Sequence, residues 1–291
     1  MRVLLDTTYA LRGPSGTAVY LERLSAALRA EGVDVVEAAD ERRPPPAGGG
    51  IGSARNLAHD TWWTQVALPR HARAAQADVL HHPLPALARG ACCPQVVTVH
   101  DLAFERLPEH FDPAFRRWAS LTHRRAAGGA DAVVCVSQTT RSDAMARWGI
   151  RGGRIVVAAH GPGQELATRT VDGQGYFLYV GDDEPRKNLA LLLDAHGRYR
   201  ERVGAAALDL VLAGSARAAQ EGVRCEPQPD LADLFGGAAA LVHPALYEGF
   251  GLTALEAMHA GVPVIAARSP GLAETCAGAA LYVDPYDAGA L

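Results

Sequence analysis

The stretch that decides the fold is residues 176–189, which read YFLYVGDDEPRKNL. Its first five residues are aromatic or branched and apolar, as in a strand buried in a sheet. Gly181 then permits a sharp turn, and Pro185 suits the first turn of a helix that we expect to begin at about Lys187. A strand, a glycine turn and a helix in this order are typical of a parallel α/β sheet.

Two cations, Arg186 and Lys187, lie at the expected start of this helix. Cations there oppose the helix dipole, at a cost of roughly a few tenths of a kcal/mol unless an anion lies between them. A diphosphate would meet the helix amides and both cations. Lys187 is also the only lysine of the chain. The pattern favours a diphosphate site that includes Gly181, although a solvated helix start balanced by the acidic residues 182–184 has the same pattern.

The alternation of apolar runs and helical patterns extends outward from this stretch in both directions. After it, we expect strands at 208–212, 239–242 and 262–266. Before it, a helix is expected at 17–30 and strands at 3–5, 33–36, 79–81, 96–100, 132–137 and 155–159. Continuously apolar strands suit sheets that are covered by helices on both faces. The pattern therefore predicts two α/β domains in succession.

The domain boundary is expected in the polar, glycine-rich stretch 161–175. The predicted organisation is one α/β domain at 1–162, a linker at 163–175 and a second α/β domain at 176–291. Residues 42–50, with three consecutive prolines and three consecutive glycines, are expected to form a surface loop.

A second glycine-rich turn follows the expected strand at 239–242. Residues 247–257 read YEGFGLTALEA, and we expect a helix at 252–259. Gly249 and Gly251 would let the backbone approach a ligand closely, and the helix start offers unpaired amides. Glu248 and Glu256 need not face each other, so two separate hydrogen-bonding roles are expected rather than an acid/base pair. A capped helix with a surface glutamate is the simpler alternative.

Two features of the first domain also suggest a site. Gly13 and Gly16 lie in a turn between the first strand and the first helix, where a phosphate could approach, but a plain turn is nearly as consistent with this spacing. His100 ends an expected strand and is followed by Asp101. A histidine there can hydrogen-bond a sugar hydroxyl or a phosphate, or simply cap the strand.

The composition excludes several classes of function. A net charge of −4 leaves no basic surface for nucleic acid, and the arginine pairs at 116–117 and 124–125 are expected on solvated helix faces. The sequence shows no signal peptide and no transmembrane stretch. Its five cysteines form no CxxC pair. We therefore expect a cytoplasmic protein, and a peripheral membrane contact remains compatible with the sequence.

Together these motifs resemble the family 4 retaining glycosyltransferases, also called glycosyl transferases group 1. The most similar stretch is 238–285, in which Glu248 and Glu256 match the family's E-x7-E motif. Gly181 with residues 186–189 matches its diphosphate motif, and His100 matches its histidine position. The resemblance implies the GT-B fold, in which two Rossmann-like domains face each other across a donor-binding cleft. Residues 1–162 would then form the acceptor-side domain and residues 176–291 the nucleotide-sugar-binding domain.

The resemblance also implies an activity and the residues that serve it. A hexose-type sugar would move, with retention, from a nucleoside-diphosphate sugar to an alcohol acceptor on a glycan, lipid or small molecule. No cofactor and no metal are expected, because two cations would stabilise the leaving group. The implied catalytic residues are His100, Arg186, Lys187 and Glu248. The implied donor-binding residues are Gly13, Gly16, Gly181, Arg186, Lys187, Phe250, Gly251, Leu252, Thr253 and Glu256.

The sequence departs from the family pattern in three places. The segment 214–231 is short, so a helix and strand are expected to be reduced there. His160 precedes Gly161 where the family usually has asparagine. The chain stops at Leu291, so the C-terminal helices that cross back to the first domain are expected to be absent. Acceptor specificity is expected in loops at 40–55 and 102–115.

Two other functions remain open from the sequence. One is a GT-B sugar-nucleotide epimerase or phosphorylase, and the other is a non-catalytic GT-B partner subunit.

Overall fold

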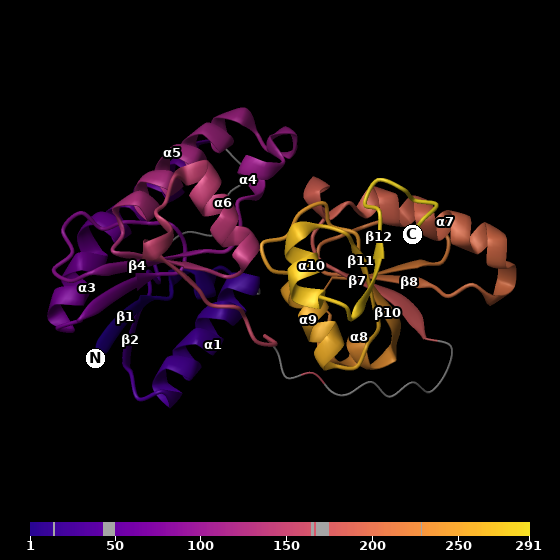
Figure 1. Cartoon of the computed structure of the whole chain (residues 1–291), viewed down its shortest axis with the longest axis horizontal. Helices are drawn as coiled ribbons and strands as arrows, with labels where there is room; N and C mark the ends of the chain where they lie inside the picture. The colour runs from indigo at the N-terminus through magenta and orange to yellow at the C-terminus, as the bar shows by residue number, and fades with distance from the viewer. Residues whose placement is uncertain (14, 43–49, 164–165, 167–174, 228) are drawn as a thin grey trace. The chain divides into compact units, whose positions relative to one another are not determined.

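A computed structural model describes residues 1–13, 15–42, 50–163, 166, 175–227 and 229–291. The chain divides into two compact units, the first of residues 1–105 with 112–163 and the second of residues 106–111 with 164–291. Each unit has one six-stranded sheet in which the paired strands run parallel, which confirms the α/β class with two parallel sheets (Figure 1). Most of the predicted linker, 163–175, lies outside the described residues.

The first sheet contains every strand predicted for it, with ends that differ by at most two residues. Its strands, in the order β2-β1-β3-β4-β5-β6, are β1 (Arg2–Asp6), β2 (Asp34–Ala38), β3 (Val79–His82), β4 (Gln95–Val99), β5 (Ala132–Cys135) and β6 (Ile155–Val157). Neighbouring side chains of β1 point to opposite faces. Leu5 packs with Leu21 of α1 (Gly16–Ala30), whereas Leu4 packs with Leu68 of α3 (Leu68–Ala74).

The helices between β2 and β6 correct the predictions for two loops. α2 (Gly50–Trp62) continues through a π-helical turn (Trp63–Ala67) into α3, so residues 50–55 are helical rather than part of a loop. Between 102 and 115 lie α4 (Ala103–Arg106), a 3-10 turn (Pro108–His110) and the start of α5 (Pro113–Gly129). Asp112 caps α5 through its carboxylate, a signal that the prediction passed over. α6 (Gln138–Trp148) precedes β6.

The second sheet has two strands that the sequence did not predict. Its strands, in the order β12-β11-β10-β7-β8-β9, are β7 (Tyr176–Val180), β8 (Leu210–Ala213), β9 (Val223–Glu226), β10 (Ala238–His243), β11 (Val264–Ala267) and β12 (Ala280–Val283). β9 and β12 lie at the two edges of the sheet and are only partly buried, so their apolar pattern is weak. The sequence predicted that a helix and a strand would be reduced in the segment 214–231. The strand is present as β9, and residues 214–222 form no helix.

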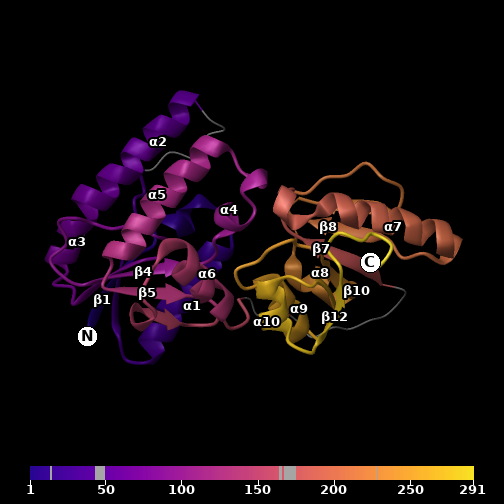
Figure 2. The same cartoon turned by 45° about the horizontal axis from the view of Figure 1, so that its top comes forward.

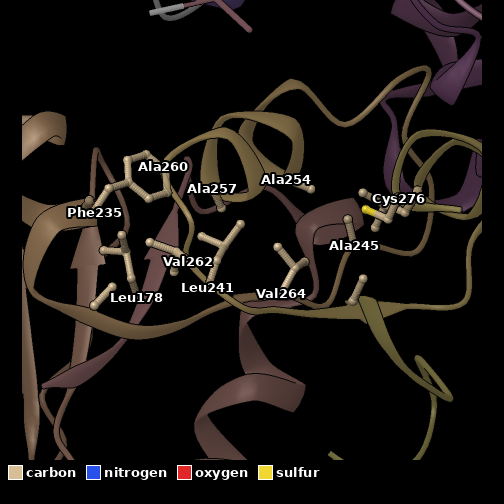
Figure 3. Close-up of a cluster of buried hydrophobic side chains, with 14 of the residues drawn as sticks. Leu178, Phe235, Leu241, Ala245, Ala254, Ala257, Ala260, Val262, Val264 and Cys276 are labelled. Carbon is tan, nitrogen blue, oxygen red and sulfur yellow. The ribbon is translucent and has the colours of Figure 1, made fainter. Parts of the chain in front are cut away.

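Helices cover both faces of the second sheet (Figure 2). On one face, α8 (Leu231–Gly237), α9 (Leu252–His259) and α10 (Pro270–Cys276) pack on Leu178 and Leu241 (Figure 3). On the other face, α7 (Leu189–Val203) packs on Tyr179 and Val242. Among the helices of the described residues, none is both long and apolar enough to cross a bilayer.

Candidate functional site

The two predicted cations lie on a short turn of their own. Residues Pro185–Lys187 form a 3-10 turn, and Asn188 adopts the left-handed conformation with a φ of 60° before α7 begins at Leu189. The predicted helix start at Lys187 is therefore two residues too early. Asparagine tolerates this conformation, and its Nδ2 donates to the carbonyl oxygens of Pro244 at 3.2 Å and Pro285 at 2.7 Å.

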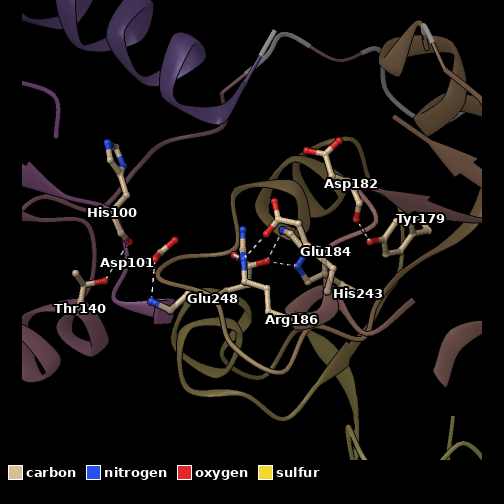
Figure 4. A network of polar contacts seen from close by, with 11 residues as sticks. His100, Asp101, Thr140, Tyr179, Asp182, Glu184, Arg186, His243 and Glu248 are labelled. Carbon is tan, nitrogen blue, oxygen red and sulfur yellow. Dashed lines mark hydrogen bonds and ion pairs between the residues drawn. The ribbon is translucent and has the colours of Figure 1, made fainter. Parts of the chain in front are cut away.

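The turn brings both cations to one carboxylate, that of Glu248. Figure 4 shows Arg186 beside this carboxylate. Nζ of Lys187 lies 2.5 Å from Oε1 of Glu248, and Nη1 of Arg186 lies 3.5 Å from Oε2. Arg186 also donates from Nε to Glu184 at 2.7 Å. The side chains of Arg186 and Lys187 are each 15% exposed and that of Glu248 is 11% exposed, so solvent screens this cluster only weakly.

His243 is a third basic neighbour of Glu248, and the sequence prediction missed it. It is the last residue of β10, and its Nε2 lies 3.2 Å from Oε1 of Glu248. Burial lowers the pKa of His243, against the attraction of Glu248. Burial by itself would raise the pKa of Glu248, but its three basic neighbours hold that pKa well below the ordinary carboxyl value. The available signal was a histidine at the carboxyl end of a predicted strand.

The cluster lies where the strand order of the second sheet reverses. β7 and β10 are neighbours, and the chain leaves β7 toward β8 on one side, whereas β11 lies on the other side of β10. Lys187 follows β7 and Glu248 follows β10, so both belong to loops at the carboxyl ends of these strands. Ligands of open parallel sheets bind at such a switch point.

The glycine-rich turn after β10 is built from close backbone contacts. Gly251 precedes α9 with a φ of 95°, a conformation that side-chain-bearing residues rarely adopt. A Cβ atom on Gly271, in α10, would lie 2.0 Å from the carbonyl oxygen of Glu248. Gly271 was not predicted, and it allows α10 to pack against the backbone that carries Glu248. The hydroxyl of Thr275 donates to the carbonyl oxygen of Phe250.

The other predicted donor residues of the second unit lie in α9 and directly after β7. Leu252 and Thr253 open α9, where first-turn amides have no partner within the helix. Glu256 lies farther along α9 and is 3% exposed, and the ion pairs of the cluster are made by Glu248 rather than by Glu256. Gly181 follows β7 with a φ of 156° and lies against Gly214, on which a Cβ atom would lie 2.8 Å from the carbonyl oxygen of Gly181.

His100 belongs to the first unit, where it is held by aromatic rings. Its ring lies 4.7 Å from that of Tyr20 and 5.8 Å from that of His160, centroid to centroid. Burial lowers the pKa of His100 to about 4, against a backbone hydrogen bond that raises it, so the ring is neutral near pH 7. Nε2 lies 3.0 Å from the carbonyl oxygen of Pro83, which can only accept.

This hydrogen bond assigns the tautomer of His100. The proton lies on Nε2, and Nδ1 presents a lone pair. His100 can therefore accept a hydrogen bond from a hydroxyl group but has no remaining N–H for a phosphate. Gly13 and Gly16 are in the same unit. Gly13 has a φ of 104°, and Gly16 begins α1 after Ser15, whose hydroxyl accepts from the amide of Ala18.

Within the described ranges, no group of three or more His, Cys, Asp or Glu side chains is arranged to hold a metal ion.

Comparison with protein families and curated proteins gives matches along both units. The family model described as Glycosyltransferase Family 4 matches residues 14–162, and the model described as Glycosyl transferases group 1 matches residues 174–291. O-antigen chain mannosyltransferase B of Escherichia coli is 29% identical over 223 residues, covering 67% of this chain and 58% of the relative. O-antigen chain mannosyltransferase RfbU of Salmonella typhimurium is 26% identical over 224 residues, covering 71% and 60%. The chain thus spans about three fifths of the length of these relatives.

Solved structures match nearly the whole chain. Sucrose-phosphate synthase from Thermosynechococcus elongatus has a TM-score of 0.75 at 18% identity, covering 100% of this chain and 87% of that one. WaaG, a glycosyltransferase involved in lipopolysaccharide biosynthesis, has a TM-score of 0.66 at 18% identity, covering 95% and 84%. These likenesses confirm the predicted GT-B fold.

Proposed function

Because the chain belongs to glycosyltransferase family 4, we propose that it transfers a hexose-type sugar from a nucleoside-diphosphate sugar to an alcohol acceptor, with retention of configuration. The acceptor hydroxyl is carried by a glycan, a lipid or a small molecule. Two relatives are named as mannosyltransferases, so mannosyl donors come first among those to be tested.

The observation that carries this proposal is the pair of cations around Glu248. Arg186 and Lys187 are mostly buried, and a single carboxylate lies between them. A diphosphate carries more negative charge than this carboxylate and matches the planar fork of arginine as well as the point charge of lysine. Binding of the donor would transfer the cations from Glu248 to the diphosphate, and Glu248 would then accept a hydrogen bond from a sugar hydroxyl.

Arg186 and Lys187 also account for the step in which the sugar is transferred. The bond between the anomeric carbon and the diphosphate oxygen breaks, its electron pair stays on the diphosphate, and the acceptor oxygen bonds the anomeric carbon on the same face. The acceptor proton leaves with the departing diphosphate. Arg186 and Lys187 stabilise the charge that grows on the leaving group, and fixed charges in a weakly solvated site are the largest contribution in many enzymes. Because two cations serve the leaving group, turnover requires no added metal.

The lone pair on Nδ1 of His100 accepts a hydrogen bond from the transferring sugar. Its neutral ring accepts a hydrogen bond at Nδ1, which suits a sugar hydroxyl and not a phosphate.

The proposal is tested by incubating the protein with a panel of nucleoside-diphosphate sugars, with and without alcohol acceptors. Release of nucleoside diphosphate that depends on the acceptor, and a product whose anomeric configuration equals that of the donor by NMR, are the expected results. Donor isomerisation without an acceptor would instead indicate the epimerase. Absence of nucleoside-diphosphate binding in calorimetry would indicate a non-catalytic partner subunit.

A further inference from the structure

His243 is buried beside Glu248, yet no step of the proposed reaction uses it. It is the last residue of β10, and its side chain is 3% exposed. Nε2 of its ring lies 3.2 Å from Oε1 of Glu248 (Figure 4). The carboxylate therefore has a contact from β10 in addition to its two ion pairs with the 3-10 turn at 185–187.

This contact assigns the proton of the His243 ring. Against the effect of burial, three basic neighbours hold the pKa of Glu248 well below the ordinary carboxyl value, so the carboxylate is ionised and can only accept. Nε2 of His243 therefore carries the proton. Burial lowers the pKa of His243, so the ring is neutral near pH 7. Nδ1 meets no partner among the described residues, and the single N–H of the ring is committed to Glu248.

The three partners of Glu248 respond differently to an incoming diphosphate. Lys187 and Arg186 are cations at the end of flexible side chains, and the proposed donor would draw both away from the carboxylate. His243 carries no net charge that a diphosphate would attract. It is also fixed at the end of a central strand, because β10 lies between β7 and β11 and pairs His243 with Ala266. His243 is therefore the partner that stays when the cations leave.

Glu248 needs a partner that stays. Its side chain is only 11% exposed, and a buried carboxylate without partners takes up a proton. A protonated carboxyl group would present a donor where the sugar hydroxyl needs an acceptor. The N–H of His243 stabilises the charge at Oε1 and leaves Oε2 open to a sugar hydroxyl.

The other titratable groups near the carboxylate cannot replace His243. These are Tyr179 and the acidic residues 182–184. Carboxylates have no proton to donate to another carboxylate. Burial raises the pKa of Tyr179, and its hydroxyl already donates to the carbonyl oxygen of Asp182 at 2.9 Å.

We propose that His243 is a positioning residue, which keeps Glu248 ionised and oriented while Arg186 and Lys187 serve the diphosphate. It acts through Glu248 and does not itself touch the donor. This inference rests on the proposed transferase function, because it names the residue that supports Glu248 in that reaction.

The pH dependence of donor turnover tests this role. The profile of kcat/KM reports groups of the free protein, whereas kcat at saturating donor reports groups of the complex. In His243→Phe, the acid limb of kcat should move up by about one pH unit or more, the scale of losing a hydrogen bond to a charged group. The acid limb of kcat/KM should move less, because Lys187 and Arg186 still hold Glu248 before the donor binds.

Two further variants separate this effect from a loss of packing. His243→Gln should restore the acid limb of kcat, because the side-chain amide can donate from Nε2 and does not titrate. His196→Phe is the matched control and should leave both acid limbs unchanged. His196 is also 3% exposed, with Nε2 3.0 Å from the carbonyl oxygen of Leu208 and an Nδ1 that meets no partner in the described part of the chain.

The tautomer of His243 can be read without activity. In protein labelled with ¹⁵N-histidine and saturated with nucleoside diphosphate, the ring should be neutral near pH 7 with its proton on Nε2. Its signals are identified by their absence in His243→Gln.

Three results overturn the inference. They are acid limbs that move together or not at all in His243→Phe, a His243→Gln variant that behaves like His243→Phe, and a His243 proton on Nδ1. Failure of the proposed function also removes the inference but is recognised separately. In that case the wild-type protein neither binds a nucleoside diphosphate in calorimetry nor turns over any donor.

Discussion

Lys187 and Glu248, which lie 61 positions apart in the sequence, form an ion pair of 2.5 Å at the switch point of the second sheet. Adjacent strands β7 and β10 bring the loops that carry them together. Both side chains are mostly buried, so solvent stabilises neither charge well and each charge depends on the other. We expect the two residues to be coupled both in folding and in donor binding.

Lys187→Ala should lower turnover by roughly 10²-fold or more, because one charge contact to the leaving group is lost. Arg186 would remain, so nucleoside-diphosphate affinity should weaken rather than disappear. Steady-state kinetics with the preferred donor checks both effects. An unchanged kcat/KM would show that Lys187 does not touch the leaving group.

The same substitution should destabilise the second unit by about 1–3 kcal/mol, because Glu248 would be left buried with fewer partners. Glu248→Gln should remove much of this penalty, so the double variant should be more stable than the sum of the two single changes predicts. Calorimetric unfolding of the four proteins measures this coupling. Strict additivity would contradict the ion pair as described.

Acid should weaken the second unit through Glu248. The pKa of Glu248 is held well below the ordinary carboxyl value of 4.5, so the stabilisation is present above pH 4.5 and is lost as pH falls toward the folded pKa. Between pH 5 and pH 3, calorimetric unfolding of the wild type should lose stability more steeply than that of Glu248→Gln. Parallel curves would show that the carboxylate has no depressed pKa.

Four histidines should make the stability of the first unit depend on pH in a higher range. Burial lowers the pKa of His81, His100, His123 and His160 from 6.5 to about 4. The unfolded chain then binds protons that the folded unit does not, so stability present above pH 6.5 is lost as pH falls toward 4.

The four tryptophans all lie in the first unit, so their fluorescence reports its unfolding selectively. We expect the midpoint of denaturant unfolding to fall between pH 6.5 and 4, with a shallower slope in His160→Phe, which keeps a ring against His100. A midpoint independent of pH over this range is the contrary result.

Gly271→Ala should displace the turn that carries Glu248. The new methyl group would lie 2.0 Å from a backbone carbonyl oxygen, which cannot move aside as a flexible side chain can. Lower melting of the second unit and weaker nucleoside-diphosphate binding are expected. Gly278→Ala is the control, because nothing lies within 4 Å of its added Cβ atom. Equal effects of the two substitutions would indicate a general loss of glycine flexibility instead.

Buried strands were predictable from sequence, and edge strands were not. The strand at Tyr176–Val180 is apolar throughout because helices cover both of its faces, whereas β9 alternates arginine and glutamate with apolar residues at the edge of the sheet. The helix after Lys187 was placed too early because Pro185 and Asn188 both suit helix starts. The hydrogen bonds from Asn188 to distant carbonyl oxygens hold Asn188 as the residue before the helix, and the sequence does not reveal these contacts.

The site residues were each predicted from a single loop. Their anion-binding chemistry is still a prediction, based on glycines and cations that directly follow buried strands and contribute little to core packing. The pairing of Lys187 with Glu248 depends on strand order, which no local pattern encodes. His243 and Gly271 were missed for the same reason, since each matters only through contact with Glu248.

The most direct test of the proposed diphosphate site uses the fact that Lys187 is the only lysine. An amine-reactive reagent can modify just this side chain and the N-terminus, and mass spectrometry of the peptides separates the two. Saturating nucleoside diphosphate should slow modification of Lys187 at least tenfold and leave the rate at Met1 unchanged. Equal rates at Lys187 with and without any nucleoside diphosphate would contradict the account.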